Sequence, residues 1–405
     1  MRLIFLVILY ILPISVTSQA LGQTIEGVVK DAETGDSIPF AHITGNEGKG
    51  TVSNQSGDFL LEKIADGSTI VVSHIGYRTK QLEVADTSKM EILLEPNVIV
   101  LAEVTLIDDS IARAIASEVM ASLAKCKNEY GKAFYRQIGT HDTIYTSFAE
   151  GFYDLAYSCS GVELVNLKQA RFAYKKSDTI PFFRYANFDY LSIGMNLYGS
   201  NQEPDINAMA KPFSLAYFKD YEFKLHRQWA TNGDTLVEVQ FYPGVKLRPV
   251  SSLQGSFIYN CTRAQLLQQK LTILHSLGAD NIEIKSKDEN RNDEVEMLNP
   301  KYRWEVFYAE NTNLINHLLV DFSYEYSLNG KIFPCSVYSH FTIYEKLNKK
   351  PRRLAEAKVT DHYSLQNAKY RPRYWRDNPV VKRTQEEEII INTFEKENAF
   401  GSYFK

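Results

Sequence analysis

Short stretches in which apolar and polar residues alternate recur along most of this chain, and turn-forming residues separate them. Alternation of this kind places every second side chain on one face of a β-strand. From Thr24 to about position 96 the stretches are short and closely spaced, and Thr69–Ser73 is apolar enough for a buried strand. The spacing of the turns predicts a small antiparallel β-sandwich over residues 24–96.

Residues 97–130 change to a helical pattern. Asp108–Ser110 offers capping groups and negative charge for a helix start, and Lys125 and Lys127 suit a helix end. The apolar positions recur every three or four residues: Ile111, Ile115, Val119, Leu123 and Cys126. We predict a linker and then an amphipathic helix from about Ser110 to Lys127. The helix could dock a partner, but packing on the following domain is the simpler interpretation.

Residues 131–405 return to β patterns. Asn329-Gly330 joins two alternating stretches, which is a hairpin signal, and Asn232-Gly233 joins two more. The strand-turn-strand pattern of residues 255–274 resembles, in a generic way, the half-barrel of periplasmic lipoprotein carriers and sensors. Glu386–Glu388 before an apolar run predicts the first turn of a terminal helix. The fold class we predict is mainly β, with a larger antiparallel, half-barrel-like C-terminal domain and minor helices.

Residues 1–20 have the pattern of a secretory signal peptide. A positive charge precedes the apolar run Leu3–Leu12, and Ser18-Gln19-Ala20 fits a cleavage site. The run is shorter than the roughly 20 apolar residues that span a membrane as a helix. Because no other long apolar run follows, we predict no transmembrane helix in the mature chain. We expect an exported protein that lies in the periplasm or associates with the outer membrane.

The four cysteines all lie in the part of the chain that we expect to be exported, where disulfides can form. They are Cys126, Cys159, Cys261 and Cys335. Four cysteines allow three pairings, and the sequence does not choose among them. The absence of a C-x-x-C spacing argues against a zinc site built from cysteines.

A series of motifs runs through the first module in a fixed order. They are Gly27-Val28-Val29-x-Asp31, Thr34-Gly35-x-x-Ile38-Pro39-x-Ala41-x-Ile43, Gly50-Thr51-x-Ser53-Asn54-x-x-Gly57-x-Phe59-x-Leu61 and Val72-Ser73-x-Ile75-Gly76-Tyr77. Together they resemble the carboxypeptidase regulatory-like domain. The resemblance implies a transthyretin-like fold and an envelope protein of Bacteroidetes type, since such domains also precede TonB-dependent transporters. In metallocarboxypeptidases this domain is an accessory without the catalytic zinc, so the resemblance implies a docking module and not a peptidase.

Three further motifs lie in the second domain. They are Phe134-Tyr135-Arg136, Glu150-Gly151 and Tyr374-Trp375-x-x-Asn378. With the first module, they resemble a group of Bacteroidetes envelope proteins. This resemblance implies a compartment and an architecture but no reaction.

Catalytic and metal-binding patterns are absent from the sequence. The eight histidines lie outside any H-E-x-x-H, H-x-x-E or H-x-H frame, and no G-x-S-x-G, P-loop or G-x-G-x-x-G motif occurs. Asp288-x-Asn290-x-Asn292 departs from an EF-hand loop at Asp293 and Asn299. We interpret His74 as a histidine on a strand face. The sequence therefore predicts no catalytic, cofactor-binding or metal-ligating residue and no cofactor.

Charge narrows the class of partner. Lys and Arg number 45 against 49 Asp and Glu, a net charge of −4, which provides no positive excess to attract nucleic acid. We predict a non-enzymatic cell-envelope binding or scaffold protein whose regulatory-like sandwich is the docking module. Its partner would be an envelope protein, or a glycan or lipid ligand, with peripheral attachment to the outer membrane. The alternatives are a glycan- or peptide-hydrolase and a lipid or lipoprotein carrier, both acting through the C-terminal domain.

Overall fold

The mainly β fold class is confirmed: of the residues that the structure describes, 59% lie in strands and 14% in helices. The computed structural model describes residues 23–45, 49–65, 67–84, 89–97, 99–100, 109–175, 198–199, 209–231, 233–245, 251–275, 295–309, 312–356, 364–365, 367–377 and 380–401. The predicted signal peptide and the Asp288-x-Asn290-x-Asn292 motif lie outside the described residues.

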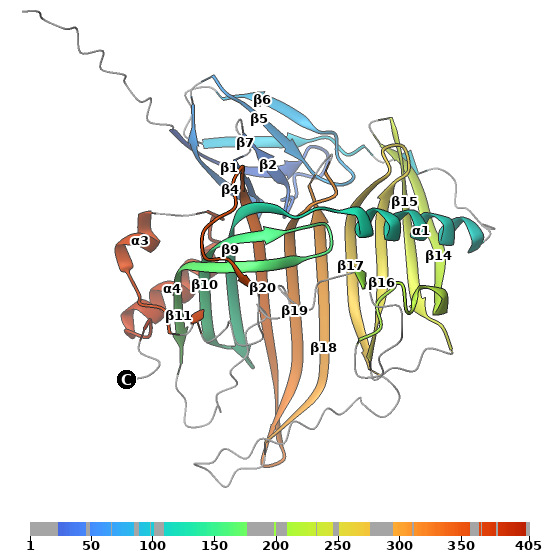
Figure 1. Ribbon diagram of the computed structural model, residues 1–405. Coiled ribbons are helices and arrows are strands. Elements are labelled where there is room, and N and C mark those ends of the chain that lie inside the picture. The colour runs from blue at the N-terminus through green and yellow to red at the C-terminus, as the bar shows by residue number, and fades with distance from the viewer. Residues whose placement is uncertain are drawn as a thin grey trace, which may run out of the picture.

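The first module is a sandwich of two small sheets, drawn in blue in Figure 1. One sheet has the order β4-β1-β7 and the other β3-β2-β5-β6. The strands are β1 (Gln23–Asp31), β2 (His42–Thr44), β3 (Gly50–Val52), β4 (Asp58–Ile64), β5 (Thr69–Ser73), β6 (Lys80–Glu83) and β7 (Lys89–Leu94). Alternate side chains such as Ile25, Phe59 and Val72 point between the sheets and form a separate core.

The second module is built on one open antiparallel sheet with the order β21-β11-β10-β9-β20-β19-β18-β17-β16-β15-β14-β8. Its strands are β8 (Ile99–Val100), β9 (Glu129–His141), β10 (Ile144–Tyr157), β11 (Val162–Tyr174), β14 (Tyr221–Thr231), β15 (Asp234–Pro243), β16 (Ser251–Asn260), β17 (Gln265–His275), β18 (Val295–Tyr308), β19 (Ile315–Leu328), β20 (Lys331–Leu347) and β21 (Ala355–Glu356). A short parallel pair, β12 (Tyr198–Gly199) and β13 (Phe213–Ser214), and a 3₁₀ turn, η3 (Phe218–Asp220), lie beside it. Most neighbours in the sheet are also neighbours in the chain, but β20 returns to pair with β9.

The predicted hairpins are present. Asn329 and Gly330 connect β19 to β20, and both have positive φ, at 51° and 81°, as a two-residue hairpin turn requires. Gly233 connects β14 to β15 with φ of 81°, while its neighbour Asn232 lies outside the described residues.

The helix α1 (Asp109–Lys125) packs against one face of the large sheet, here called the inner face, at the end of the sheet where β14 lies (Figure 1). The helix prediction is confirmed, but the predicted apolar stripe was wrong at its first position. Ile111 is 52% exposed, and the buried side chains are Ala112, Ala116, Val119 and Leu123. Small alanine side chains let the backbone of the helix come close to the aromatic sheet face, so they and not the bulkier isoleucine lie against it.

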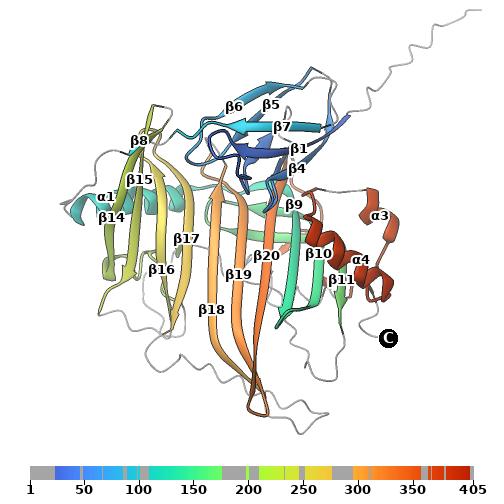
Figure 2. The same cartoon turned by 180° about the vertical axis from the view of Figure 1, so that it is seen from behind.

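The opposite, outer face carries the sandwich and the C-terminal helices, as Figure 2 shows from behind. These helices are α3 (Pro372–Asp377) and α4 (Gln385–Lys396), the second being the predicted terminal helix. Trp375 packs with Phe134 and Phe152 of the outer face and with Val52 of the sandwich. The tail, the sheet and the sandwich therefore meet on one side of the molecule.

A β-bulge in β14 between Leu225 and Arg227 exchanges the faces of its side chains. Before the bulge, Tyr221 and Phe223 belong to the inner-face core. After it, Trp229 lies on the outer face, where it packs near Ile75 of the sandwich. The bulge thus supplies an aromatic side chain to the contact between the two modules.

Candidate ligand-binding site

The sandwich rests on the outer face of the large sheet through a contact that we call the joint. Side-chain hydrogen bonds cross it: Thr51 Oγ1 donates to the Val380 carbonyl at 3.0 Å, Asn54 Nδ2 donates to the Lys382 carbonyl at 3.2 Å, and His42 Nδ1 pairs with the Asn316 amide. Lys49 and Glu345 add an isolated antiparallel bridge between the sandwich and β20. Lys382 Nζ also lies 3.4 Å from a carboxylate oxygen of Glu26. Several cavities lie beside this contact, so it is packed less continuously than a domain core, as contacts between domains often are.

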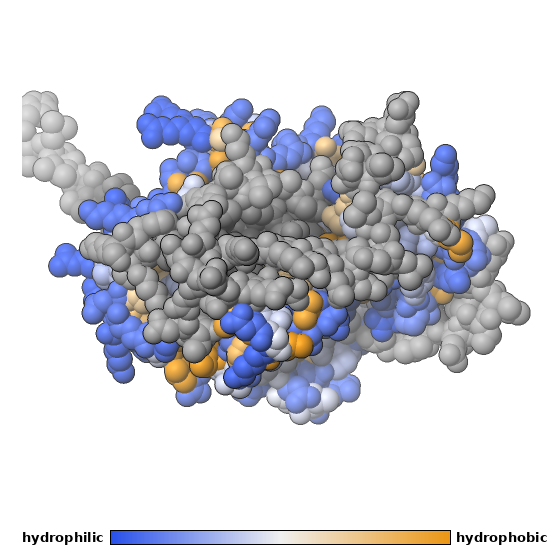
Figure 3. Space-filling view, turned by 90° about the horizontal axis from the view of Figure 1, so that it is seen from below, coloured by the Kyte–Doolittle hydropathy of each residue, from blue (hydrophilic) through white to orange (hydrophobic). Residues whose placement is uncertain are grey.

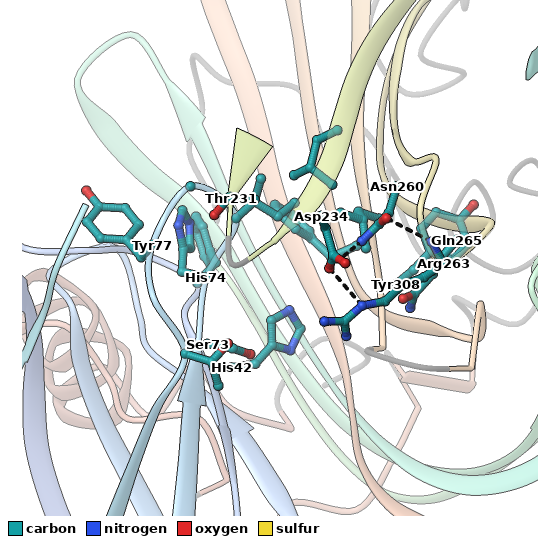
Figure 4. Close-up of a pocket in the computed structure, with 17 residues that line it drawn as sticks. His42, Ser73, His74, Tyr77, Thr231, Asp234, Asn260, Arg263, Gln265 and Tyr308 are labelled. Carbon is teal, nitrogen blue, oxygen red and sulfur yellow. Dashed lines mark hydrogen bonds and ion pairs between the residues drawn. The ribbon is translucent and has the colours of Figure 1, made fainter. Parts of the chain in front are cut away.

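A crevice opens at one side of the joint and encloses about 800 Å³, solvent included. The turn after β5 forms one wall, and the turns at the ends of β14–β15 and β16–β17 form the other. Its floor is apolar, and consists of Ile75, Leu236, Leu267 and Phe307. Figure 4 shows polar side chains from both modules around this floor. An apolar floor with a few polar groups is the usual form of a ligand site.

The polar groups on the sheet side form a neutral cluster. Asp234 Oδ2 accepts a hydrogen bond from Asn260 Nδ2 at 2.9 Å and lies 2.7 Å from Arg263 Nε. The Arg263 side chain is 47% exposed, whereas that of Asp234 is 13% exposed. Since the two charges cancel, the crevice has no charge excess that would select a strongly ionic ligand.

Two buried polar atoms in the crevice lack a hydrogen-bond partner among the described residues. They are the Thr231 hydroxyl and His74 Nδ1, one from each module. Buried polar atoms are nearly always paired in folded proteins, so unpaired ones at a cavity point to groups that a ligand or solvent satisfies. Their position on opposite walls would let one ligand contact both modules.

The motif Ser73-x-Ile75-Gly76-Tyr77 of the first module lies in this crevice. Gly76 has φ of 91°, which only glycine adopts readily, and Tyr77 donates a hydrogen bond to Asp31 at 2.9 Å. Burial and this carboxylate raise the pKa of Tyr77 to about 12. Our interpretation of His74 as a strand-face histidine was wrong, because β5 ends at Ser73 and the ring lies in the turn that follows.

The motifs of the second domain come together in a buried charge cluster beside the joint. Glu150 lies 2.7 Å from Arg136 Nε and 2.6 Å from Arg171 Nη2, and Arg136 Nη1 lies 2.8 Å from Glu387 of α4. The Arg171 guanidinium also lies 4.8 Å from the ring centre of Trp375. Arg171 Nη1 also lies 3.7 Å from Glu395 of α4. Carboxylates of the sheet and of α4 thus neutralise both arginines, and the cluster fastens the C-terminal tail to the sheet.

Burial by itself would raise the pKa of the Glu150 carboxyl. The guanidinium groups of Arg171 and Arg136 outweigh burial and hold this pKa at about 2. Glu150 therefore stays ionised at any physiological pH and is not a proton donor.

Residues 25–106 match the sequence model of the CarboxypepD_reg-like domain. The first module carries a CarboxypepD_reg-like domain. No curated protein matches the chain. Among solved structures, the LolA superfamily protein NE2245 from Nitrosomonas europaea is 10% identical, over 59% of this chain and 94% of its own, with a TM-score of 0.17. The P pilus usher (PapC) translocation pore is 10% identical, over 80% and 76%, with a TM-score of 0.14. Similarity this low carries no argument about fold or function.

The CarboxypepD_reg-like domain thus contributes one wall of the crevice. That wall contains the motif Ser73-x-Ile75-Gly76-Tyr77, which could be identified from the sequence. Sequence reasoning missed the other wall, formed by Thr231, Asp234, Asn260 and Arg263. The only signal was that these residues flank two hairpin turns, because pairing of β15 with β16 is what brings the turns together. The described residues hold no group of three or more His, Cys, Asp or Glu that could bind a metal ion.

A second groove of about 700 Å³ lies beside His42, but the crevice is the one with unpartnered buried polar atoms on both of its walls. No helix in the described ranges is both long and apolar enough to cross a membrane. Seen from below, the described residues are mostly hydrophilic, with a few separate hydrophobic spots (Figure 3). The crevice is therefore our candidate site.

Proposed function

We propose that this chain is an exported, non-enzymatic binding protein of the cell envelope. The CarboxypepD_reg-like domain acts as the docking module: it rests on the large sheet and encloses a ligand or a partner segment in the crevice. The supporting observation is the pair of unpartnered buried groups, Thr231 Oγ1 and His74 Nδ1, on opposite walls above an apolar floor. We propose the same division into modules that the sequence predicts, at 24–96, 97–130 and 131–405.

A lipid carrier would bind its cargo on the inner face of the sheet. That face is a weaker candidate site than the crevice on the outer face. On the inner face, Phe241, Phe257 and Phe322 are completely buried and pack within the core. A carrier of acyl chains would instead need apolar side chains that line open space.

The crevice also supports binding better than hydrolysis. Ser73 and His42 are partners in adjacent strands, but no hydrogen bond joins their side chains. Nucleophilic catalysis by serine requires such a bond to the general base. The single carboxylate lining the crevice, Asp234, is held by Arg263.

Site-specific photo-crosslinking in native envelopes tests this proposal. A photoreactive phenylalanine analogue at Thr79, which is exposed and lines the crevice, should form a defined adduct. The same analogue at the exposed Glu163 of β11 should form none. The variant Leu267→Glu, which places a charge on the crevice floor, should lose the adduct, whereas Ile389→Glu on the exposed face of α4 should keep it. Equal labelling at both positions, or an adduct that survives Leu267→Glu, would overturn the proposal.

A further inference from the structure

Four of the eight histidines converge on the joint, two from each module. His42 and His74 come from the CarboxypepD_reg-like domain, and His317 and His340 come from β19 and β20. The rings of His317 and His340 lie 5.9 Å apart, centre to centre. Phe40 of the sandwich stacks on His317 at 5.3 Å. Residues far apart in the sequence therefore form one histidine cluster across the joint.

The hydrogen bonds of these rings engage neutral partners. His42 Nδ1 pairs with the Asn316 amide, and His317 Nδ1 pairs with the Thr342 hydroxyl at 2.6 Å. His74 Nδ1, His317 Nε2 and His340 Nδ1 are buried without a partner among the described residues. No described salt bridge involves a histidine of the joint.

The carboxylates around the cluster are already occupied by cations. On the sheet side, Glu387 of α4 and Glu150 of β10 are held by Arg136 of β9, and the crevice carboxylate Asp234 by Arg263. In a groove of about 700 Å³ beside His42, Glu345 of β20 lies 2.8 Å from Lys132 and is accompanied by Lys346. On the sandwich side, Glu26 and Asp58 face Lys382. A proton added to any of the four rings would thus create a charge without a free counter-ion.

The joint also has space for hydration. The crevice and the groove flank His42, and a third cavity of about 290 Å³ is lined by His317, His340 and the neutral Tyr338. A loosely packed contact can separate without breaking a continuous core, and separation would give all four rings access to water.

We propose that the joint is an acid-released contact: protonation of its histidine cluster detaches the CarboxypepD_reg-like domain from the large sheet and opens the crevice. Release of a bound ligand by this opening rests on the function proposed above, whereas the opening itself does not.

The sign of the pH effect follows from the ring environments. Burial, and then the neighbouring His74, lower the pKa of His42 from 6.5 to about 4. Burial likewise lowers the pKa of His74, His317 and His340. The detached state therefore binds protons more tightly than the docked state.

Docking weakens as the pH falls below about 6.5, and for His42 the effect levels off below about 4. His42 alone reduces the docking constant by about 70-fold between about pH 7.5 and about pH 4.5. Glu150, with its pKa of about 2, remains charged in this range, so the sheet and its tail stay folded.

Electron–electron distance measurements between two spin labels test the proposal on the full mature chain without ligand. One label replaces the exposed Glu83 of the sandwich and the other the exposed Glu222 of β14, in a Cys261→Ser background. A single short distance is expected at pH 7.5, and a longer and broader distribution at pH 4.5. The double variant H42Q/H74Q should stay docked at pH 4.5, and His226→Gln, at an exposed histidine of β14, should open like the natural sequence.

An unchanged distance at pH 4.5, or equal opening of H42Q/H74Q, would overturn the proposal. If H42Q/H74Q is already detached at pH 7.5, His340→Gln on the sheet side replaces it. Docking of that variant at pH 4.5 would support the proposal, and opening equal to that of the natural sequence would overturn it. The readout needs no ligand, and the photo-crosslinking described above is performed at neutral pH. Failure of one experiment therefore leaves the other to be judged separately.

Discussion

At the scale of single residues, Glu150 holds two buried arginines in place. The Glu150 carboxylate and the guanidinium groups of Arg136 and Arg171 are removed from water. Each charge is therefore stabilised by its partners and not by solvent. Arg171 is 1% exposed, and its guanidinium also contacts the rings of Trp375 and Phe400. Loss of Glu150 would leave the buried Arg171 with only the more distant and partly exposed carboxylate of Glu395, at 3.7 Å.

We predict that Glu150→Gln lowers the free energy of unfolding by about 3–5 kcal/mol, because the amide is isosteric but uncharged. Urea unfolding at neutral pH, followed by tryptophan fluorescence, measures this change. The matched control is Glu91→Gln, whose ion pair with Lys30 is on the surface with a glutamate that is 55% exposed. The control should cost less than about 1 kcal/mol. Similar losses in the two variants would show that the buried cluster is not a stabilising anchor.

At the scale of elements, the start of α4 is stabilised by hydrogen bonds in its first turn. Thr384 accepts a hydrogen bond from the Glu387 amide at 3.1 Å, and the Glu387 carboxylate accepts one from the Thr384 amide at 2.9 Å. This capping box also aims Glu387 at Arg136, so one residue both starts the helix and attaches it to the sheet.

We predict that Thr384→Ala destabilises α4 by about 1 kcal/mol, because an amide at the helix start loses its acceptor. Hydrogen exchange of the α4 amides should become faster. Thr393→Ala on the same helix is the control, since Thr393 is exposed and its hydroxyl donates to the Ile389 carbonyl within the helix. Faster exchange in both variants would mean that the cap has no special part in holding α4.

At the scale of the whole molecule, a disulfide between Cys126 and Cys159 joins the end of α1 to the turn between β10 and β11. Cys261 is an exposed free thiol and Cys335 a buried one. The disulfide closes a loop with a sequence separation of 33 residues. It thereby limits the freedom of the unfolded chain and keeps the helix on the inner face.

We predict that reduction lowers the stability of the chain by about 2–4 kcal/mol. Thermal unfolding with and without reductant measures this loss. Cys261→Ser should keep the full sensitivity to reductant, and a Cys126→Ser, Cys159→Ser double variant should unfold at the lower temperature in either condition. An unchanged midpoint on reduction would contradict the prediction.

The sequence by itself determined the local elements of this protein. The hairpin turn at Asn329-Gly330, the acidic start of α4 and the motifs of the CarboxypepD_reg-like domain all depend on residues within a few positions of one another. Turn and cap residues interact with neighbours a few positions away in the chain, so their patterns can be recognised from the sequence alone.

Only the tertiary structure decided which distant side chains meet. Pairing of β20 with β9 places His340 beside Arg136, and pairing of β15 with β16 brings Asp234 near Asn260. It also chose Cys126 and Cys159 from the possible pairs. Alternation along a strand shows that a residue lies on one face, but it does not show which strand comes next or what covers that face. The crevice and the histidine cluster depend on strand order and on how the two modules pack. Each is assembled from both modules, and no sequence pattern indicates that these modules are in contact.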